Sequence, residues 1–403
     1  MDSSIDVHDI VIIGGGIVGL ATALALHRKG LRSLVLEKSE TLRAHGTTIG
    51  IHTNGWRALH QLGVADELRT KAGIILNRDG GEARCVKRRD LLKALADHLP
   101  SDTVRFNSGV ISIEKLDPKT TSNHGLLLVD GSVLYAKILI GCEGWKSLVA
   151  EELGLGAAKV SPLVGLRGLT HYPQGHGYDR EFLVIRHKDY YIGRTTSDDT
   201  TISWFLARKR KPNDSEIMYS PKGIVESALE SVKSLPREKI GQARKSEVEE
   251  MMRSCDLDTA VYTIIRYRTP WEIFFGKFRD GMMTVAGDAM HVMGPFLQQG
   301  GSCGLEDAIS LARNLASELD RVKNITNVDD NDRAVLWRRR AAVGIDNYVR
   351  ERRMRLLKLS SQSYLIGLIA TVSASHLQFG IYLLGLLLFR RAYKHTEFDI
   401  GRL

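Results

Sequence analysis

The sequence predicts an α/β fold in which a parallel-sheet domain is split along the chain by an antiparallel β layer and is followed by helices. Three observations predict it. An apolar run, a glycine turn and a helical pattern occupy 9–38, and runs rich in strand-forming residues fill 160–270. A buried strand and a helix then return within 284–319. We therefore expect the parallel-sheet domain in two parts, 1–158 and 276–330, around a mainly β domain at 159–275, with C-terminal helices at 331–403.

The first element is a βαβ unit. Residues 10–13 form a short apolar run that ends at glycine, which is typical of a buried strand. Helical spacing follows over 17–29, and "SLVLEK" (33–38) gives a second strand. Such a unit requires a parallel sheet with a right-handed crossover.

The elements that follow complete this pattern. An amphipathic helix is expected at 88–99, and a hairpin at 126–142 should turn at Asp130-Gly131 before it enters a buried strand. Runs such as "EFLVIRH", "YYIGRT" and "TISWFLAR" predict the β layer. Residues 304–319 have a clear helical pattern. Exposed linkers are expected at 211–216 and 325–332.

Composition limits the class of protein. With 403 residues, of which 43% are hydrophobic and 26% charged, the chain can bury a large core and is not expected to be disordered. Its acidic start leaves no room for a secretory or transit signal, so a cytoplasmic location is expected. The four cysteines form no CxxC pair, which argues against disulfides and against a metal site.

The net charge of +9 favours no particular partner. Dense basic patches occur only at 208–211 ("RKRK") and 350–355 ("RERRMR"), and we interpret both as solvated surface. No aromatic-interleaved RNA motif or helix-turn-helix accompanies them, so no nucleic-acid partner is expected.

An apolar stretch near the C-terminus (364–391) raises the question of a membrane. Its longest unbroken run is the eleven residues Phe379 to Phe389, short of the roughly 20 that a spanning helix needs. Packing on the body or on a partner subunit is therefore favoured over a peripheral helix at a membrane surface, and a true span is the weakest alternative.

The glycine turn carries the first functional signal. Gly14, Gly16 and Gly19 fit the pattern GxGxxG, with Gly14 for the turn, Gly16 for close approach to a diphosphate and Gly19 for contact between helix and strand. Glu37 ends the second strand, where it can bind a ribose and disfavours the 2′-phosphate of NADP. A Rossmann-type dinucleotide site is therefore predicted, although a glycine turn made for packing alone is the plain alternative.

A distant segment, "TVAGDAMHVMGPFLQQGG" (284–301), indicates whether the dinucleotide is FAD or NAD. Asp288 follows a strand and can aim its carboxylate at the ribityl hydroxyls of a flavin. The helix that begins near Gly300 and Gly301 can offer N–H groups to the pyrimidine oxygen of the flavin.

With these residues the sequence resembles the single-component (group A) FAD-dependent monooxygenases, the class of p-hydroxybenzoate hydroxylase. It looks most like the plant salicylate-hydroxylase-like members and zeaxanthin epoxidase. The likeness covers almost the whole chain and includes "RCVKRRDLLKAL", "ILIGCEGWKSLVAEELGL", "LEDAISLA" and the closing "FDIGRL".

The resemblance implies an enzyme that binds FAD, takes electrons from a visiting NAD(P)H and transfers oxygen from O2 to a small molecule by hydroxylation or epoxidation. It implies FAD contacts from Gly14, Gly16, Ile17, Val18, Gly19, Glu37, Lys38, Arg43, Arg88, Val110, Glu143, Asp288, Gly300 and Gly301. Pro295 and Gln298 are expected at the flavin edge as the catalytic environment. His291 is interpreted as structural and Cys303 as a small packing residue.

Substrate contacts are expected from Phe296, Leu297 and Trp204. For Trp204, as for Phe182, Val184 and Leu206, an ordinary place in the core is the alternative.

Two positions depart from the family pattern. Glu143-Gly144 replaces the Asp-Gly of the family, and Gln298 replaces a glycine beside the flavin. Both departures keep two alternatives open: a repurposed flavoenzyme, such as an oxidase or a redox-neutral cyclase or isomerase, and a non-catalytic flavin-binding protein.

Overall fold

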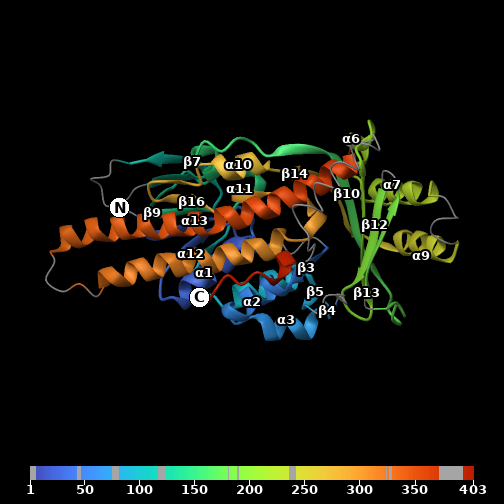
Figure 1. Ribbon diagram of the computed structural model, residues 1–403, viewed down its shortest axis with the longest axis horizontal. Coiled ribbons are helices and arrows are strands. Elements are labelled where there is room, and N and C mark those ends of the chain that lie inside the picture. Colours follow the sequence, from blue (N-terminus) through green and yellow to red (C-terminus); the bar gives the residue numbers. More distant parts are fainter. Residues whose placement is uncertain are drawn as a thin grey trace.

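The computed structural model consists of two sheet-based layers, and one long helix, α13 (Asp330–Thr371), runs from the first layer to the second (Figure 1). It describes residues 6–42, 47–74, 81–116, 124–179, 181–187, 190–235, 242–323, 325, 329–371 and 394–403. The predicted fold class, a split parallel-sheet domain with an antiparallel insertion and C-terminal helices, is confirmed.

The first sheet contains the parallel strands. Its order is β15-β16-β9-β1-β2-β6, with β7 and β8 attached beside β9, and all neighbours from β16 to β6 run parallel. The residues of β1 from Ile10 onward are buried because both faces of the sheet are covered, as expected of a parallel sheet. The strands are β1 (Val7–Ile13), β2 (Leu34–Leu36), β6 (Val104–Arg105), β7 (Val110–Lys115), β8 (His124–Leu128), β9 (Val133–Gly141), β15 (Arg279–Asp280) and β16 (Met283–Val285).

The predicted hairpin joins β8 and β9. Gly131 has φ +81°, a conformation that glycine adopts at little cost, and the Asp130 carboxylate accepts the N–H of Ser132. The same domain contains the small sheet β3 (Thr48–His52), β5 (Ala83–Lys87) and β4 (Gly73–Ile74). Its shorter helices are α1 (Ile17–Arg28), α2 (Thr53–Leu62), α3 (Ala65–Lys71), α4 (Arg88–Asp97), η1 (Gly144–Lys146), α5 (Leu148–Glu152), α10 (Pro270–Phe275), α11 (Asp288–His291) and η2 (Pro295–Leu297).

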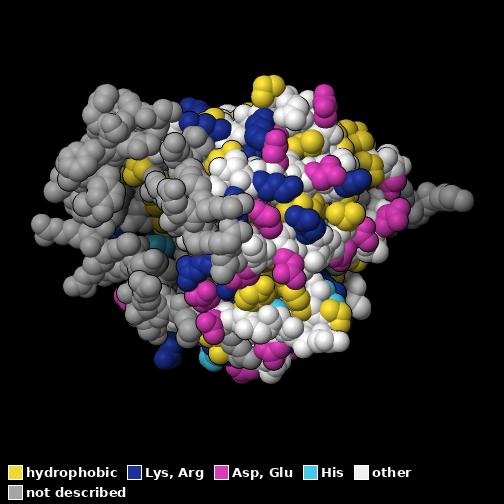
Figure 2. Space-filling model, turned by 90° about the vertical axis from the view of Figure 1, so that its right-hand side faces the viewer, with side chains coloured by type: hydrophobic (Ala, Val, Ile, Leu, Met, Phe, Trp, Pro, Cys, Tyr) yellow, Lys and Arg dark blue, Asp and Glu magenta, His cyan; other side chains and the backbone are white. Residues whose placement is uncertain are grey.

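The inserted β layer is a five-stranded antiparallel sheet of order β11-β12-β13-β10-β14. Helices α7 and α9 cover its outer face, where acidic and basic side chains are interspersed on the surface (Figures 1 and 2). The elements are β10 (Lys159–His171), β11 (Phe182–His187), β12 (Tyr190–Thr196), β13 (Thr201–Lys209), β14 (Cys255–Tyr267), α6 (Asp214–Ile217), α7 (Pro221–Lys233) and α9 (Gln242–Arg253).

Helices α12 (Gly300–Lys323) and α13 (Asp330–Thr371) form an antiparallel pair along the long axis of the molecule (Figure 1). With 42 residues, α13 is about 63 Å long and extends from the parallel-sheet domain to the β layer. The short helix η3 (Lys394–Glu397) then leads the chain end back toward α2, where Arg57 donates to the carbonyl oxygen of Glu397.

The two expected exposed linkers are correct only in part, since 212–213 and 329–332 are exposed but helices begin within both ranges. Part of 211–216 forms α6, and Asp214 is buried there because its carboxylate pairs with Arg208. Helix α13 already begins at Asp330, inside the second expected linker.

The apolar C-terminal stretch begins in the last turns of α13, and its residues 372–391 lie outside the described part of the chain. Among the helices that are described, none has the length and apolar character needed to cross a membrane.

Candidate active site

The predicted cofactor residues meet at one edge of the first sheet. Gly14, Glu37, Glu143 and Asp288 follow the carboxyl ends of β1, β2, β9 and β16. These four strands are parallel neighbours, so their carboxyl ends face the same side of the molecule. Residues far apart in the sequence therefore line one crevice, at the point where strand order reverses around β1 and where ligands of such sheets bind.

The glycine loop after β1 has two tight positions and one open position. Gly14 has φ +105°, and a Cβ on it would lie 2.7 Å from the carbonyl oxygen of Cys142. A Cβ on Gly19 would overlap the Gly14 carbonyl oxygen at 1.9 Å. Gly16, by contrast, has an ordinary φ of −78°, and a Cβ there would meet no protein atom within 4 Å.

Gly16 therefore faces open space directly at the N-terminus of α1. The free N–H groups and partial positive charge of a helix N-terminus suit a diphosphate. No protein contact requires a glycine at this position. Its lack of a side chain fits the close approach of a dinucleotide diphosphate to the start of the helix. The loop thus fits the dinucleotide that the sequence predicts.

Glu37 supports this loop from the neighbouring strand. Its buried carboxylate accepts the N–H of Gly15 at 2.8 Å and the N–H of Ser39 at 2.9 Å. Glu37 thus stands at the end of the second strand of the βαβ unit, where an acidic residue of a dinucleotide-binding fold contacts a ribose. Lys38 is exposed beside it, and Val110 opens β7 in the segment next to the Glu37 backbone, whose carbonyl accepts from Ser108.

Asp288 begins α11 at this edge of the sheet. It is exposed, although the residues on either side, Gly287 and Ala289, are buried. Desolvation by the surrounding protein raises the pKa of the Asp288 carboxyl, and the positive charges of His291 and Arg88 oppose this shift. Arg88 is the first residue of α4 and is likewise exposed.

The turn before Asp288 packs tightly on α1. Gly287 has φ +65°, and a Cβ on it would come within 2.7 Å of Val18. A Cβ on Gly304 of α12 would come within 2.4 Å of the same side chain. Val18 thus packs against both segments, which fixes the Asp288 turn relative to the glycine loop.

The loop before α12 carries an unusual backbone conformation at Gln298. This residue ends η2 with φ +53°, in the left-handed region where the family pattern has glycine. Its side chain points toward β3, because its Oε1 would lie 2.9 Å from a Cβ on Gly50. Helix α12 begins two residues later, and Gly300 faces open space, as Gly16 does.

Glu143 directs its carboxylate into the protein. Oε2 accepts the hydroxyl of Ser147 at 2.7 Å, and Oε1 accepts the N–H of Val149 at the start of α5. Burial raises the pKa of this carboxyl against the effect of these hydrogen bonds. The longer side chain therefore caps α5, and its availability to a bound cofactor is reduced.

A family model described as an FAD binding domain matches residues 7–327. The chain belongs to this FAD-binding family. Monooxygenase 1 of Arabidopsis thaliana is 43% identical over 418 aligned positions, covering 98% of this chain and 99% of the relative. Monooxygenase 2 of the same plant is 33% identical and covers 98% of each chain. The chain is accordingly an FAD-dependent monooxygenase of the single-component class, as the resemblance implied.

Solved structures agree with this fold. HpxO of Klebsiella pneumoniae, complexed with FAD and uric acid, superposes with a TM-score of 0.73 at 17% identity, over 98% of this chain and 97% of that one. PqsL of P. aeruginosa, in complex with 2-aminobenzoylacetate, gives 0.69 at 18% identity over 94% and 100%. At these identities the likeness shows the fold alone.

The structure distinguishes among the predicted substrate residues of the monooxygenase. Phe296 and Leu297 are half-buried in η2, and Phe296 packs with Leu163 and Ile265 of the β layer. Trp204 is fully buried with the side chains beneath α7 and α9, on the sheet face turned away from the FAD-binding domain. This position favours the alternative, a place in the core, and the substrate role of Trp204 stays a prediction.

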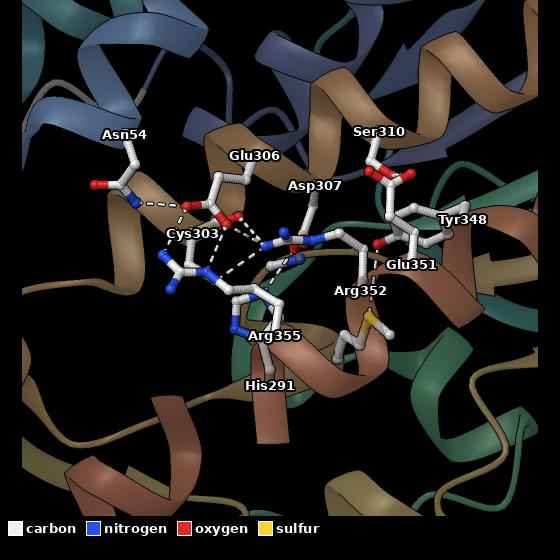
Figure 3. Close-up of polar contacts among 12 residues, drawn as sticks. Asn54, His291, Cys303, Glu306, Asp307, Ser310, Tyr348, Glu351, Arg352 and Arg355 are labelled. Atoms are coloured by element: carbon white, nitrogen blue, oxygen red, sulfur yellow. Dashed lines mark hydrogen bonds and ion pairs between the residues drawn. The ribbon is translucent and has the colours of Figure 1, made fainter. Parts of the chain in front are cut away.

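The expectation of a solvated surface at 350–355 was wrong for two arginines. Arg352 is fully buried on α13; its Nε donates to Asp307 at 2.7 Å and its Nη2 pairs with Glu306 at 2.8 Å (Figure 3). Arg355 is also buried and pairs with Glu306 at 3.0 Å. The basic patch at 208–211 contains a similar case, since Arg208 is buried and pairs with Asp214.

This buried cluster connects to the cofactor edge through Asp307. One oxygen of its carboxylate accepts the N–H of Gly287 at 2.8 Å and lies 2.6 Å from His291 Nε2. Burial would raise the pKa of Asp307, but the charges and hydrogen bonds of His291 and Arg352 outweigh it and lower the pKa. Asp307 thereby holds the turn that carries Asp288, and His291 has the structural role expected of it.

Cys303 lies at the same cluster. Its sulfur, His291 and Asp307 have potential metal-ligand atoms within 4.8 Å of one another. The Arg352 guanidinium already contacts both Cys303 Sγ, at 3.1 Å, and Asp307, so a cationic side chain provides the positive charge there. Cys303 is fully buried, as expected of a small packing residue.

Sequence reasoning missed several residues and left one untested. Arg43 lies outside the described residues. Asp307 and Arg352 were overlooked because each charge was interpreted alone, without an oppositely charged partner. The available signal was the pair of adjacent acidic residues inside the apolar helical pattern "LEDAISLA". Arg167, exposed on β10, was also missed.

Proposed function

We propose that this monooxygenase uses NAD(P)H and O2 to hydroxylate or epoxidise a small aromatic or terpenoid-like metabolite. The convergence of residues at the carboxyl edge of the first sheet carries the proposal. Asp288 and Arg88 are exposed at this edge, and the inner face of the β layer packs beside it on Phe296 of η2. The sequence contains one GxGxxG pattern, so a nicotinamide cofactor would visit without a Rossmann domain of its own.

Each group at this edge has a role that its position supports. Gly16 and the N-terminus of α1 would hold the FAD diphosphate, and Asp288 would accept hydrogen bonds from the ribityl hydroxyls. The N–H groups at Gly300 and Gly301 would bind the pyrimidine edge. Bound FAD supplies the electron transfer and oxygen activation, while the β layer covers the reacting face and excludes water.

Gly16→Ala tests the cofactor site with little effect on the fold. A Cβ at Gly16 meets no protein atom and φ is ordinary, so the variant should fold normally and lose FAD affinity by a factor on the order of 100. Gly156→Ala is the matched control, because a Cβ there also meets nothing within 4 Å, in a loop away from the crevice. Equal FAD affinity of the two variants would contradict the assignment of Gly16.

Oxygen transfer is tested with the holoenzyme, labelled O2 and a panel of small aromatic and terpenoid-like compounds. We expect NAD(P)H consumption that increases with the correct compound and one labelled oxygen atom in the product. Turnover without O2 uptake or NAD(P)H consumption would contradict the proposal.

One observation favours a second candidate, a flavoenzyme that no longer uses NAD(P)H. The Glu143 carboxylate, at the position where the family's Asp-Gly is thought to serve the nicotinamide cofactor, is held by Ser147 and Val149. If Glu143→Asp restores reduction that the wild type lacks, this second candidate describes the natural chain. If both proteins are reduced at the same rate, the first proposal stands.

A further inference from the structure

Helix α10 carries three aromatic side chains on one exposed side. Trp271 is 57% exposed, Phe274 47% and Phe275 79%. Residues three and four positions apart share one side of a helix, so these rings lie together, whereas Ile273 packs into the core. Such a concentration of large apolar side chains on a six-residue helix indicates an interaction surface.

The aromatic surface continues onto α13 and β14. Trp271 contacts Tyr364 of α13, with ring centroids 5.9 Å apart, and Tyr364 contacts Tyr267 of β14 at 5.7 Å. Both tyrosines are half-exposed, and α10 packs beside α13 (Figure 1). We call the rings of Trp271, Phe274, Phe275, Tyr267 and Tyr364 the aromatic face.

A hollow of about 450 Å³ adjoins the aromatic face, because Tyr267 and Tyr364 also line it. Apolar side chains line it further in, among them Ile265 of β14, Phe296 of η2 and Leu368 of α13. The hollow therefore extends from the aromatic face to η2, the element that precedes Gln298.

The charge around the aromatic face is positive. Lys159 is exposed and is the register partner of Tyr267, so the two side chains lie on the same side of the sheet. Within the described residues no carboxylate pairs with Lys159. Glu272, the one acid in the sequence of α10, is held in the cap at the start of that helix. In the sequence no acidic residue occurs between Glu351 of α13 and Glu397.

We infer that the aromatic face docks on the surface of an anionic phospholipid bilayer. Trp, Tyr and Phe rings are favoured at the boundary between headgroups and acyl chains, and basic side chains beside them attract anionic lipids. The sequence that continues from Thr371, which lines the hollow, has the same character, with eleven unbroken apolar residues from Phe379 to Phe389.

Charge favours a bilayer over a second copy of the chain as the occupant. A symmetric dimer through the aromatic face would bring two copies of Lys159 and two acid-free ends of α13 together, whereas anionic lipid complements them. When the face is docked, the hollow opens toward the bilayer, and an apolar compound can reach η2 without crossing water. The inference goes beyond the proposed function and does not depend on it.

The experiment measures cosedimentation of the FAD-loaded enzyme with vesicles of phosphatidylcholine alone and of an equal mixture with phosphatidylglycerol. We expect binding to the mixed vesicles and a partition coefficient about tenfold lower in Phe275→Ser, because the variant loses a large apolar side chain from the contact. Val335→Ser is the matched control and should bind normally. Val335 is 64% exposed on α13, about 44 Å from Tyr364 along the helix.

Charge and orientation have separate readouts. Lys159→Gln should lower binding to the mixed vesicles about fivefold and leave binding to phosphatidylcholine alone unchanged. Arg32→Gln, an exposed arginine in the loop after α1, is its control. Brominated acyl chains quench tryptophans that enter a bilayer, so quenching of the wild type should be largely lost in Trp271→Phe, which keeps a ring and the other four tryptophans.

Three results would overturn the inference. The first is absence of binding to the mixed vesicles, and the second is an equal loss of binding in Phe275→Ser and Val335→Ser. The third is a dimer in solution that ignores vesicles and that Phe275→Ser dissociates, which would assign the aromatic face to a second copy. Each of these results leaves the proposed oxygen transfer intact.

Discussion

Replacing Arg352 with methionine tests whether the buried cluster on α12 and α13 stabilises the cofactor edge. Arg352 has no exposed surface and donates to Asp307, Glu306 and the carbonyl oxygen of Cys303. Methionine fills much of the volume of the aliphatic stem, so the main loss is the charge. Removing one partner of a buried ion pair costs about 3–5 kcal/mol, because an uncompensated charge remains.

The cost should lie near the lower end of this range. Asp307 keeps His291 and the N–H of Gly287, and Glu306 keeps Arg355. At about 2.1 cal/mol/K of unfolding entropy per residue, the 403 residues give roughly 0.85 kcal/mol/K. A loss near 3 kcal/mol therefore lowers the thermal midpoint by about 4 °C if the chain unfolds as one unit.

The assay is thermal unfolding of FAD-saturated protein, followed by circular dichroism at one protein concentration and one heating rate. Arg340→Met is the matched control on the same helix, since Arg340 pairs with Glu318 at 3.1 Å and is 35% exposed. Pairs of this kind contribute about 1 kcal/mol or less, so the control should shift the midpoint by about 1 °C at most. Equal shifts in the two variants would refute the stabilising role of the buried cluster.

Three further predictions concern single side chains. Burial, with the charge of Lys115, lowers the pKa of His124 to about 4, so the unfolded chain takes up a proton first as pH falls below about 6.5. Unfolding free energy should drop by about 2 kcal/mol between pH 7 and pH 5, and His124→Leu should remove that part of the pH dependence. Burial would raise the pKa of Asp198, but Lys87 at 2.6 Å and the N–H of Thr200 hold it at about 2. This stabilisation is complete above about pH 4 and lost toward pH 2. In Asp198→Asn the thermal midpoint should therefore fall less steeply as the pH is lowered through this range. Gln298→Gly removes left-handed strain but adds freedom to the unfolded chain, so stability should change by about 1 kcal/mol or less. Stopped-flow reduction by NAD(P)H should become faster, and an unchanged rate would mean that Gln298 is neutral.

Local patterns were sufficient to predict the parallel-sheet domain and the segments that form the cofactor edge. The turn at Gly14 and the helix after Gly16 follow from neighbouring residues, and Asp288 follows a strand whose apolar run is complete in itself. Since carboxyl ends of parallel strands share one side of a sheet, assigning the strands also assigns the neighbourhood of these residues. The positive φ of Gln298 was not predicted, because its backbone conformation depends on how η2 meets α12.

The buried charges could not be predicted from charge density. Arg352 and Asp307 are 45 positions apart, and Arg208 is buried only because α6 places Asp214 against it. A basic run on a helix is normally solvated, and only a facing acid changes that outcome. The partner must be known before burial can be inferred, and the pairing of α12 with α13 is a tertiary feature.

Arg167 shows what the pattern of a strand can reveal once its covering helices are known. An arginine between apolar neighbours on an antiparallel strand ordinarily marks the solvent face of a sheet with one side covered. Here α7 and α9 cover the face that carries Val164 and Leu166, and the FAD-binding domain lies against the other, so neither face is open solvent. A charged side chain on the inner face then lies at the boundary with another domain, which the strand pattern alone does not reveal. Among the described residues Arg167 donates to the Thr263 hydroxyl of the neighbouring strand, so its surroundings follow from the tertiary arrangement and not from its own strand.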